Sequence, residues 1–275
     1  MNCKNNLQIW FKSYLLITVV IVMATHFGHA ETTGNEPPFK STEERDWTIQ
    51  VQAFELPISG FLSAESRNVL RKWGKVMEEF RGSCAAPMMK TGDGIIRFRK
   101  CLDEHIHFPI ITTHRDHYNV SVRPKSIGGV YTEVITPIGG VSLKNKNRVL
   151  INLHGGSFVV GGRSGGQIES IPIAALGEIK VVSIDYRMAP EHKFPAASED
   201  VTSVYKELLK DYSPKNIGIY GCSAGGILTA EAVAWFLKEG LPTPGAIGMF
   251  CGAAYAIDFG DSFYIGPALE GKTPE

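Results

Sequence analysis

The sequence predicts an α/β fold with a largely parallel sheet that helices cover on both faces. Short apolar runs, typical of buried strands, alternate with longer helical patterns in the second half of the chain. A two-residue hairpin pattern, Gly128-Gly129, precedes this alternation, and no strand-like alternation of any length occurs before Val120. Continuous apolar strands that alternate with helices are typical of parallel sheets buried on both faces.

The expected elements can be placed in chain order. Residues 48–118 carry helical periodicity, with apolar side chains one, three and four positions apart between Val69 and Phe80. Residues 119–127 and 130–136 are expected to form the antiparallel hairpin. Four buried strands are then expected at 148–153, 180–184, 216–220 and 246–251, with helices between them at 167–176, 196–209 and 226–238.

Composition excludes several classes of protein. The chain has 275 residues, of which 44% are hydrophobic and 20% are charged, so it is neither disordered nor fibrous. Lys plus Arg and Asp plus Glu each total 28, and this zero net charge argues against a nucleic-acid partner. Five cysteines are too few for a disulfide scaffold.

Residues 1–30 are typical of a secretory signal peptide. Lys4 and Lys12 are the only charged side chains before Glu31, and an apolar run of 11 residues begins at Tyr14. Small residues then precede a cleavage site after Ala30. Because 11 apolar residues are too few to cross about 30 Å of hydrocarbon, a membrane anchor is disfavoured. The protein is therefore expected to be exported, to a periplasm or to the medium, without stable membrane insertion.

An exported chain works in an oxidising compartment. Cys84 and Cys101 lie close enough in sequence to form a disulfide, although sequence alone leaves their pairing open. Cys222 and Cys251, at the ends of two expected strands, are expected to be buried free thiols. Residues 31–47 are polar, contain Pro37-Pro38, and are expected to be a linker.

The strongest chemical motif lies between the strand at 216–220 and the helix at 226–238. Gly221-Cys222-Ser223-Ala224-Gly225 is a G-x-S-x-G pattern in a strand–turn–helix setting. In so tight a turn, side chains two positions either side of the serine would collide, and glycine removes them. Ser223 is then held at the C-terminal end of the sheet, as expected of a nucleophile.

A second motif follows the strand at 148–153. The sequence there is His154-Gly155-Gly156-Ser157, and glycines just past a strand let backbone N–H groups point at a substrate oxygen. Acyl transfer develops negative charge on that oxygen, and fixed donors stabilise it. The N–H groups of Gly155, Gly156 and Ala224 are expected to form this oxyanion hole. His154 is expected to be structural rather than a general base.

These motifs, with a third block, resemble the hormone-sensitive-lipase branch of the α/β-hydrolase esterases. The third block is Asp185 to His192 (DYRMAPEH), with Phe194 to Ala197 (FPAA) following. The resemblance covers about residues 120–255. It implies an α/β-hydrolase domain over 119–275, a helical cap region over 48–118, and Ser223 as the nucleophile. Ser157 departs from the third glycine of the family motif, and Cys222 departs from the usual aspartate before the nucleophile.

The same resemblance places a triad acid and then a histidine after the serine. All eight histidines precede Ser223, and Asp258 and Asp261 follow the strand at 246–251 one element too early for the triad acid. We therefore expect the hydrolase domain to be incomplete, with C-terminal strands missing. The chain as given is expected to be inactive, and the complete protein is expected to be a serine carboxylesterase.

The remaining histidines raise the question of a metal site. Four of them have ligand-like spacings, but no cysteine or carboxylate arrangement completes a familiar site: His105, His107, His114 and His117. They are expected to lie in the cap or at the surface, and His192 in a turn. No metal or other cofactor is expected.

The expected function is hydrolysis of a small-molecule ester through an acyl-enzyme on Ser223. Two alternatives remain open. One is a non-catalytic ligand-binding protein, since the gibberellin receptors resemble esterases but have lost the triad. The other is an amidase or peptidase that uses the same triad. The sequence does not indicate the oligomeric state.

Cleavage after Ala30 is the first testable prediction. Removal of residues 1–30 takes away Lys4 and Lys12 and no acidic residue, so the mature chain carries 26 − 28 = −2 charges. N-terminal sequencing or intact mass of the protein from its native host should show a chain that begins at Glu31. A chain that still begins at Met1 and fractionates with membranes would favour an anchor.

Overall fold

The computed structural model describes residues 58–84 and 92–254. The expected signal peptide (1–30) and linker (31–47) lie outside the described residues, as do Asp258 and Asp261. None of the described helices is long and apolar enough to cross a bilayer.

A six-stranded mixed sheet forms the centre of the fold, in the order β1-β2-β4-β3-β5-β6. Its strands are β1 (Val120–Ile127), β2 (Val130–Pro137), β3 (Val149–Leu153), β4 (Lys180–Ile184), β5 (Ile217–Cys222) and β6 (Ala246–Phe250). Ile127 pairs with Val130 across the two glycines, so the predicted hairpin is confirmed. β2 runs antiparallel to β4, and β4, β3, β5 and β6 are mutually parallel.

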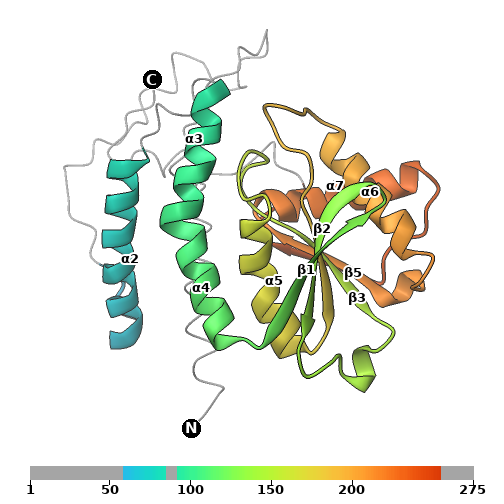
Figure 1. Cartoon of the computed structure of the whole chain (residues 1–275), viewed down its shortest axis with the longest axis horizontal. Coiled ribbons are helices and arrows are strands. Elements are labelled where there is room, and N and C mark those ends of the chain that lie inside the picture. Colours follow the sequence, from blue (N-terminus) through green and yellow to red (C-terminus); the bar gives the residue numbers. More distant parts are fainter. Residues whose placement is uncertain (1–57, 85–91, 255–275) are drawn as a thin grey trace, which may run out of the picture.

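Helices cover both faces of the sheet, as the apolar strands predict (Figure 1). They are α5 (Ser164–Gly177), α6 (Ala196–Leu208) and α7 (Ala224–Lys238), and two short 3-10 turns, η4 (Leu143–Asn145) and η5 (Pro214–Asn216), precede β3 and β5. Because side chains alternate along a strand, Ile151 and Leu153 of β3 pack toward α6 and α7, while Leu150 packs toward α5. The predicted α/β class is therefore confirmed.

The last described strand, β6, pairs with β5 on one side. It is more exposed than the other parallel strands, with Ile247 49% and Phe250 42% accessible. Cys251 follows β6 with a left-handed φ of 53° and is exposed, so the expectation of a buried thiol is wrong at this position. Cys222, which ends the interior strand β5, is buried as expected.

The N-terminal helical region consists of α2 (Ala64–Ser83), α3 (Gly92–Leu102), the π-helical turn η3 (Asp103–His107) and α4 (Phe108–His117). Figure 1 shows α3 and α4 as one rod beside the sheet domain, with α2 outermost. The apolar faces of α2, α3 and η3 meet in a cluster that includes Phe80, Phe98 and Ile106. This cluster extends to Val160, which lies in the loop after β3. The helical region therefore packs against that loop.

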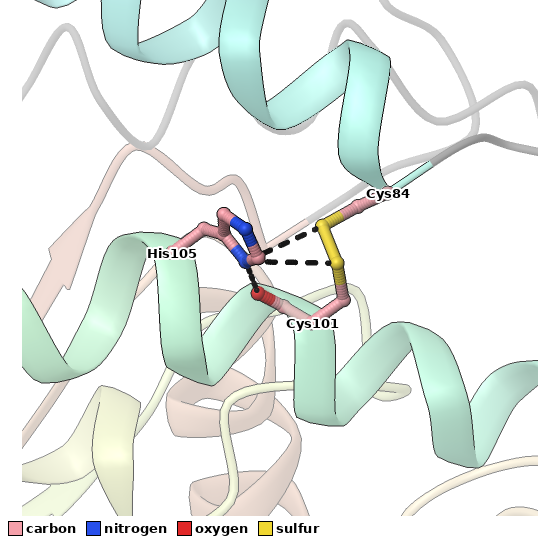
Figure 2. The surroundings of a disulfide bond; sticks show 3 residues. All are labelled: Cys84, Cys101 and His105. Atoms are coloured by element: carbon pink, nitrogen blue, oxygen red, sulfur yellow. Dashed lines mark hydrogen bonds between the residues drawn. A yellow bond between two sulfur atoms is a disulfide. The ribbon is translucent and has the colours of Figure 1, made fainter.

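A disulfide joins two helices of this region: Cys84, just after α2, is bonded to Cys101 of α3. Figure 2 shows the exposed His105 beside this bond, with Nδ1 3.9 Å from the sulfur of Cys84 and 3.7 Å from that of Cys101. These three residues group as metal ligands do, but the two sulfurs are bonded to each other and are not free thiolates.

Polar contacts also fix the helical region to the sheet domain. Arg99 of α3 donates to the carbonyl of Val159 at 2.6 Å and to the Ala189 carbonyl at 2.7 Å, and it binds both carboxylate oxygens of Glu191. Farther along, His107 and Asp103 contact Ser164, the first residue of α5. The helical region is therefore anchored to both loops that flank the C-terminal ends of β3 and β4.

His114 of α4 makes stability depend on pH. Burial lowers the pKa of His114 to about 4, and the nearby His117 adds to the effect. Because this pKa lies below its ordinary value of 6.5, the contribution of His114 to stability is complete above about pH 6.5 and is lost progressively as the pH falls from there to about 4. His114→Phe retains the edge-on ring contact with Tyr118. Between pH 7 and pH 4.5, the melting temperature of the variant should fall by less than that of wild type. Equal losses in the two proteins would contradict the assignment.

Candidate active site

Ser223 lies at the junction of β5 and α7, at the C-terminal end of the sheet. Its backbone has φ 55° and ψ −121°, a conformation that residues with side chains rarely adopt. Such strain costs about 1–3 kcal/mol and persists only where the surroundings impose it. Here the Ser223 N–H donates to the Phe250 carbonyl at 2.8 Å, and the Ile227 N–H donates to the Ser223 carbonyl at 3.1 Å. The turn is therefore fixed from β6 and from α7.

The two glycines that flank the serine are required by close packing. A Cβ on Gly221 would lie 2.5 Å from the carbonyl carbon of Gly225. A Cβ on Gly225 would lie 2.7 Å from the carbonyl carbon of Leu153 and 2.8 Å from the His154 oxygen. The turn therefore closes on itself and also abuts the end of β3, which places Ser223 against the His154-Gly155-Gly156-Ser157 loop.

The structure distinguishes among the three expected oxyanion donors. The N–H of Gly155 donates to Glu169 Oε1 at 2.9 Å, so it is occupied in this conformation. The N–H groups of Gly156 and of the next residue, Ser157, form no hydrogen bond within the described part of the chain. Ala224 is the first residue of α7, and a helix leaves its first N–H groups without intrahelical acceptors. Within the residues that the structure describes, the N–H groups near this turn that lack a hydrogen-bond acceptor are therefore those of Gly156, Ser157 and Ala224.

His154 is fully buried at the end of β3. Its ring stacks on Tyr186 with centroids 4.2 Å apart, and its Nδ1 contacts the Gly155 carbonyl at 2.8 Å. The Tyr186 hydroxyl donates to the His154 carbonyl at 2.6 Å. Burial lowers the pKa of His154, so the ring is neutral. His154 thus fixes the start of the loop, in the structural role that the sequence analysis expected.

Glu169 of α5 is a site residue that the sequence analysis missed. Besides the Gly155 N–H, it accepts a hydrogen bond from Asn152 Nδ2 at 2.7 Å. Burial of the carboxyl group raises the pKa of Glu169 to about 7, although the residue as a whole keeps some accessible surface. A single acidic residue between the buried positions Ile168 and Ile171 was the available sequence feature. This feature did not indicate a role for Glu169, because the sequence does not show which segments α5 faces.

The block Asp185 to His192 supports the site from the side of β4. Arg187 pairs with Asp200 of α6, which also accepts the Arg187 backbone N–H at 2.8 Å. Asp185 pairs with Arg163 just before α5, with 3.0 Å between Arg163 Nε and Asp185 Oδ2. His192 is exposed in the loop before α6, as expected. Within residues 58–84 and 92–254, no histidine hydrogen-bonds to the Ser223 hydroxyl.

Known proteins share this fold and part of this sequence. Residues 150–263 match a family described as alpha/beta hydrolase fold. An esterase from Acinetobacter venetianus is 31% identical over 121 residues, which are 44% of this chain and 38% of that protein. The chain spans less than half the length of the curated relatives it matches.

Solved structures give the same relationship. The esterase E25 superposes with a TM-score of 0.63 at 30% identity, covering 79% of this chain and 65% of that one. An esterase from the bacterial hormone-sensitive lipase family superposes with a TM-score of 0.55 at 27% identity, covering 73% of this chain and 63% of that one. With the Ser223 turn and the loop after β3, these likenesses show an α/β-hydrolase fold in a chain that resembles the esterases of the hormone-sensitive lipase family.

Proposed function

We propose that the protein hydrolyses carboxylic esters through an acyl-enzyme on Ser223. The observation that carries this proposal is the strained Ser223 turn, packed directly against a glycine loop whose N–H groups are unoccupied at Gly156 and Ser157. A nucleophile and a set of donors for developing negative charge are the two components that acyl transfer requires. The similar esterases support the same chemistry.

In this proposal, the Ser223 hydroxyl attacks the ester carbonyl. The N–H groups of Gly156, Ser157 and Ala224 stabilise the negative charge that develops on the carbonyl oxygen. The N-terminus of α7 adds its positive partial charge at the same place, because the helix begins at Ala224. These donors are held in place before the reaction, so their orientation costs no reorganisation during it.

The serine also needs a base to accept its proton. None of the histidines among the described residues is proposed as this base. His154 is committed to Gly155 and Tyr186, and His107 contacts Asp103 and Ser164. The family resemblance places the base after Ser223 in chain order. The activity described is therefore that of the full-length protein.

We also propose that the protein is exported. The disulfide between Cys84 and Cys101 supports it, because such bonds persist in oxidising compartments and are rare in the cytosol. The bond joins the end of α2 to α3, and the exposed His105 lies beside it (Figure 2).

Ser223→Ala tests the nucleophile. The full-length protein should hydrolyse a short-chain aryl ester such as p-nitrophenyl acetate or butyrate. The variant should lose essentially all of this turnover while its melting temperature stays close to that of wild type, because only the hydroxyl is removed. A matched control is Ser203→Ala on α6, whose hydroxyl donates to the Glu199 carbonyl and lies outside the site. This control should keep wild-type activity.

Different outcomes separate the alternative functions. Turnover in Ser223→Ala within a few-fold of wild type would rule out Ser223 as the nucleophile. Hydrolysis of an anilide or a peptide in preference to the matched ester would indicate an amidase or peptidase. A wild-type protein that binds aryl esters without hydrolysing them would indicate a ligand-binding protein.

A further inference from the structure

One carboxyl group, that of Glu169, contacts three segments that converge on the site. Its Oε1 accepts the N–H of Gly155 at 2.9 Å, and its Oε2 accepts the side-chain amide of Asn152 at 2.7 Å. The backbone of Cys222, the residue before the nucleophile, also hydrogen-bonds to this carboxyl group. Glu169 of α5 therefore joins β3, the loop after β3 and the turn that carries Ser223.

The three segments are packed closely around this group. A Cβ on Gly155 would lie 2.8 Å from the Cys222 carbonyl oxygen and 3.5 Å from both Glu169 Oε1 and the Ser223 Cβ. Glu169 and Ser223 thus both lie close to the same backbone position. A change in the tilt of the Gly155 peptide would move both the loop and its contact with the serine.

The surroundings of Glu169 hold the carboxyl group through hydrogen bonds rather than ion pairs. The titratable side chains that face it in the described structure are Tyr186 and Tyr220, whose phenol pKa values are raised by burial. Burial likewise raises the pKa of Glu169. A buried carboxyl group without a cation is costly, and its hydrogen bonds offset only part of that cost. An apolar residue at this position would leave the Gly155 N–H and the Asn152 amide without their acceptor, so the carboxyl group is what holds these two donors.

We propose that Glu169 is a positioning residue for the oxyanion hole. By accepting the Gly155 N–H, it fixes the Gly155 peptide and so aims the following N–H groups, those of Gly156 and Ser157, at the substrate. This inference rests on the proposed ester hydrolysis. Gly156 has a φ of 120°, which is open to glycine alone, so the loop depends on outside contacts for its conformation. Preorganised donors are effective only when their orientation is fixed.

Glu169→Gln tests the inference because it keeps the size of the side chain. The amide has one acceptor oxygen, and its NH2 group must face a donor, either Gly155 N–H or Asn152 Nδ2. We expect kcat of the full-length protein to fall about 10- to 100-fold, less than the loss of an oxyanion donor, with KM changed by less than about threefold. If Glu169 had a purely structural role, its substitution would lower the melting temperature without lowering kcat at nearly constant KM.

A double variant provides the rescue. In Asn152→Asp with Glu169→Gln, the donor and the acceptor exchange places. The amide introduced at position 169 accepts from the Gly155 N–H and donates to the carboxylate introduced at position 152. This variant should recover most of the lost kcat. If Glu169→Gln alone gives no soluble protein, the double variant still tests the inference. If Glu169 acts through these hydrogen bonds, the double variant should fold and hydrolyse the ester. Failure of the double variant to do so would overturn the inference.

Glu133→Gln is the matched control. Glu133 lies on β2, has a pKa raised by burial, and accepts a hydrogen bond from the amide of Gln167 at 2.9 Å, but it contacts neither the loop nor Ser223. This variant should keep kcat within about twofold of wild type.

Hydrogen–deuterium exchange gives a readout that does not need turnover. Amides within residues 154–160 should exchange about threefold faster or more in Glu169→Gln than in wild type and in Glu133→Gln. Unchanged exchange in this segment would overturn the inference, whatever the kinetics. Absence of Ser223-dependent hydrolysis in wild type would instead overturn the proposed function, and exchange would still show whether Glu169 holds the loop.

Discussion

The contact between the start of α7 and the end of β3 is the constraint on which the site depends. A side chain on Gly225 would collide with the backbone of Leu153, and one on Gly221 would collide with Gly225 itself. The parallel pairing of β3 with β5, in which Leu153 lies opposite Gly221, brings these segments together. Only glycine allows the approach, and the approach places the strained Ser223 against the glycine loop that follows β3.

That loop is held from several directions because it is a backbone segment with few side chains of its own to fix it. Tyr186 of the β4 loop binds the His154 carbonyl, and Arg99 of the cap binds the Val159 carbonyl. Glu169 of α5 accepts the Gly155 N–H between them. Val160 joins the apolar cluster of the cap helices. The N-terminal helical region therefore contacts the loop after β3 through Arg99 and through the cluster that includes Val160.

The electrostatics of the site follow from burial. His154 is kept neutral by a lowered pKa and Glu169 has a raised pKa, because both are enclosed beside the sheet. A neutral His154 stacks on Tyr186 without placing a cation in the core. The unoccupied N–H groups and the N-terminus of α7 then supply the positive potential at the site, and backbone groups keep this potential at any pH.

Sequence alone determined the strands, the hairpin and the tight turn at Ser223, because these depend on local patterns. Apolar runs mark the strands, and the spacing of Gly221 and Gly225 around Ser223 marks the turn. Sequence also marked the loop after β3 and predicted the Gly155 N–H as an oxyanion donor. In the structure this N–H donates to Glu169, which α5 brings to it from 14 residues away. The exposure of Cys251 and the pairing of Cys84 with Cys101 were likewise settled in three dimensions. Local spacing fixes which atoms a turn can present, whereas the partner of each buried polar group depends on which elements the fold packs together.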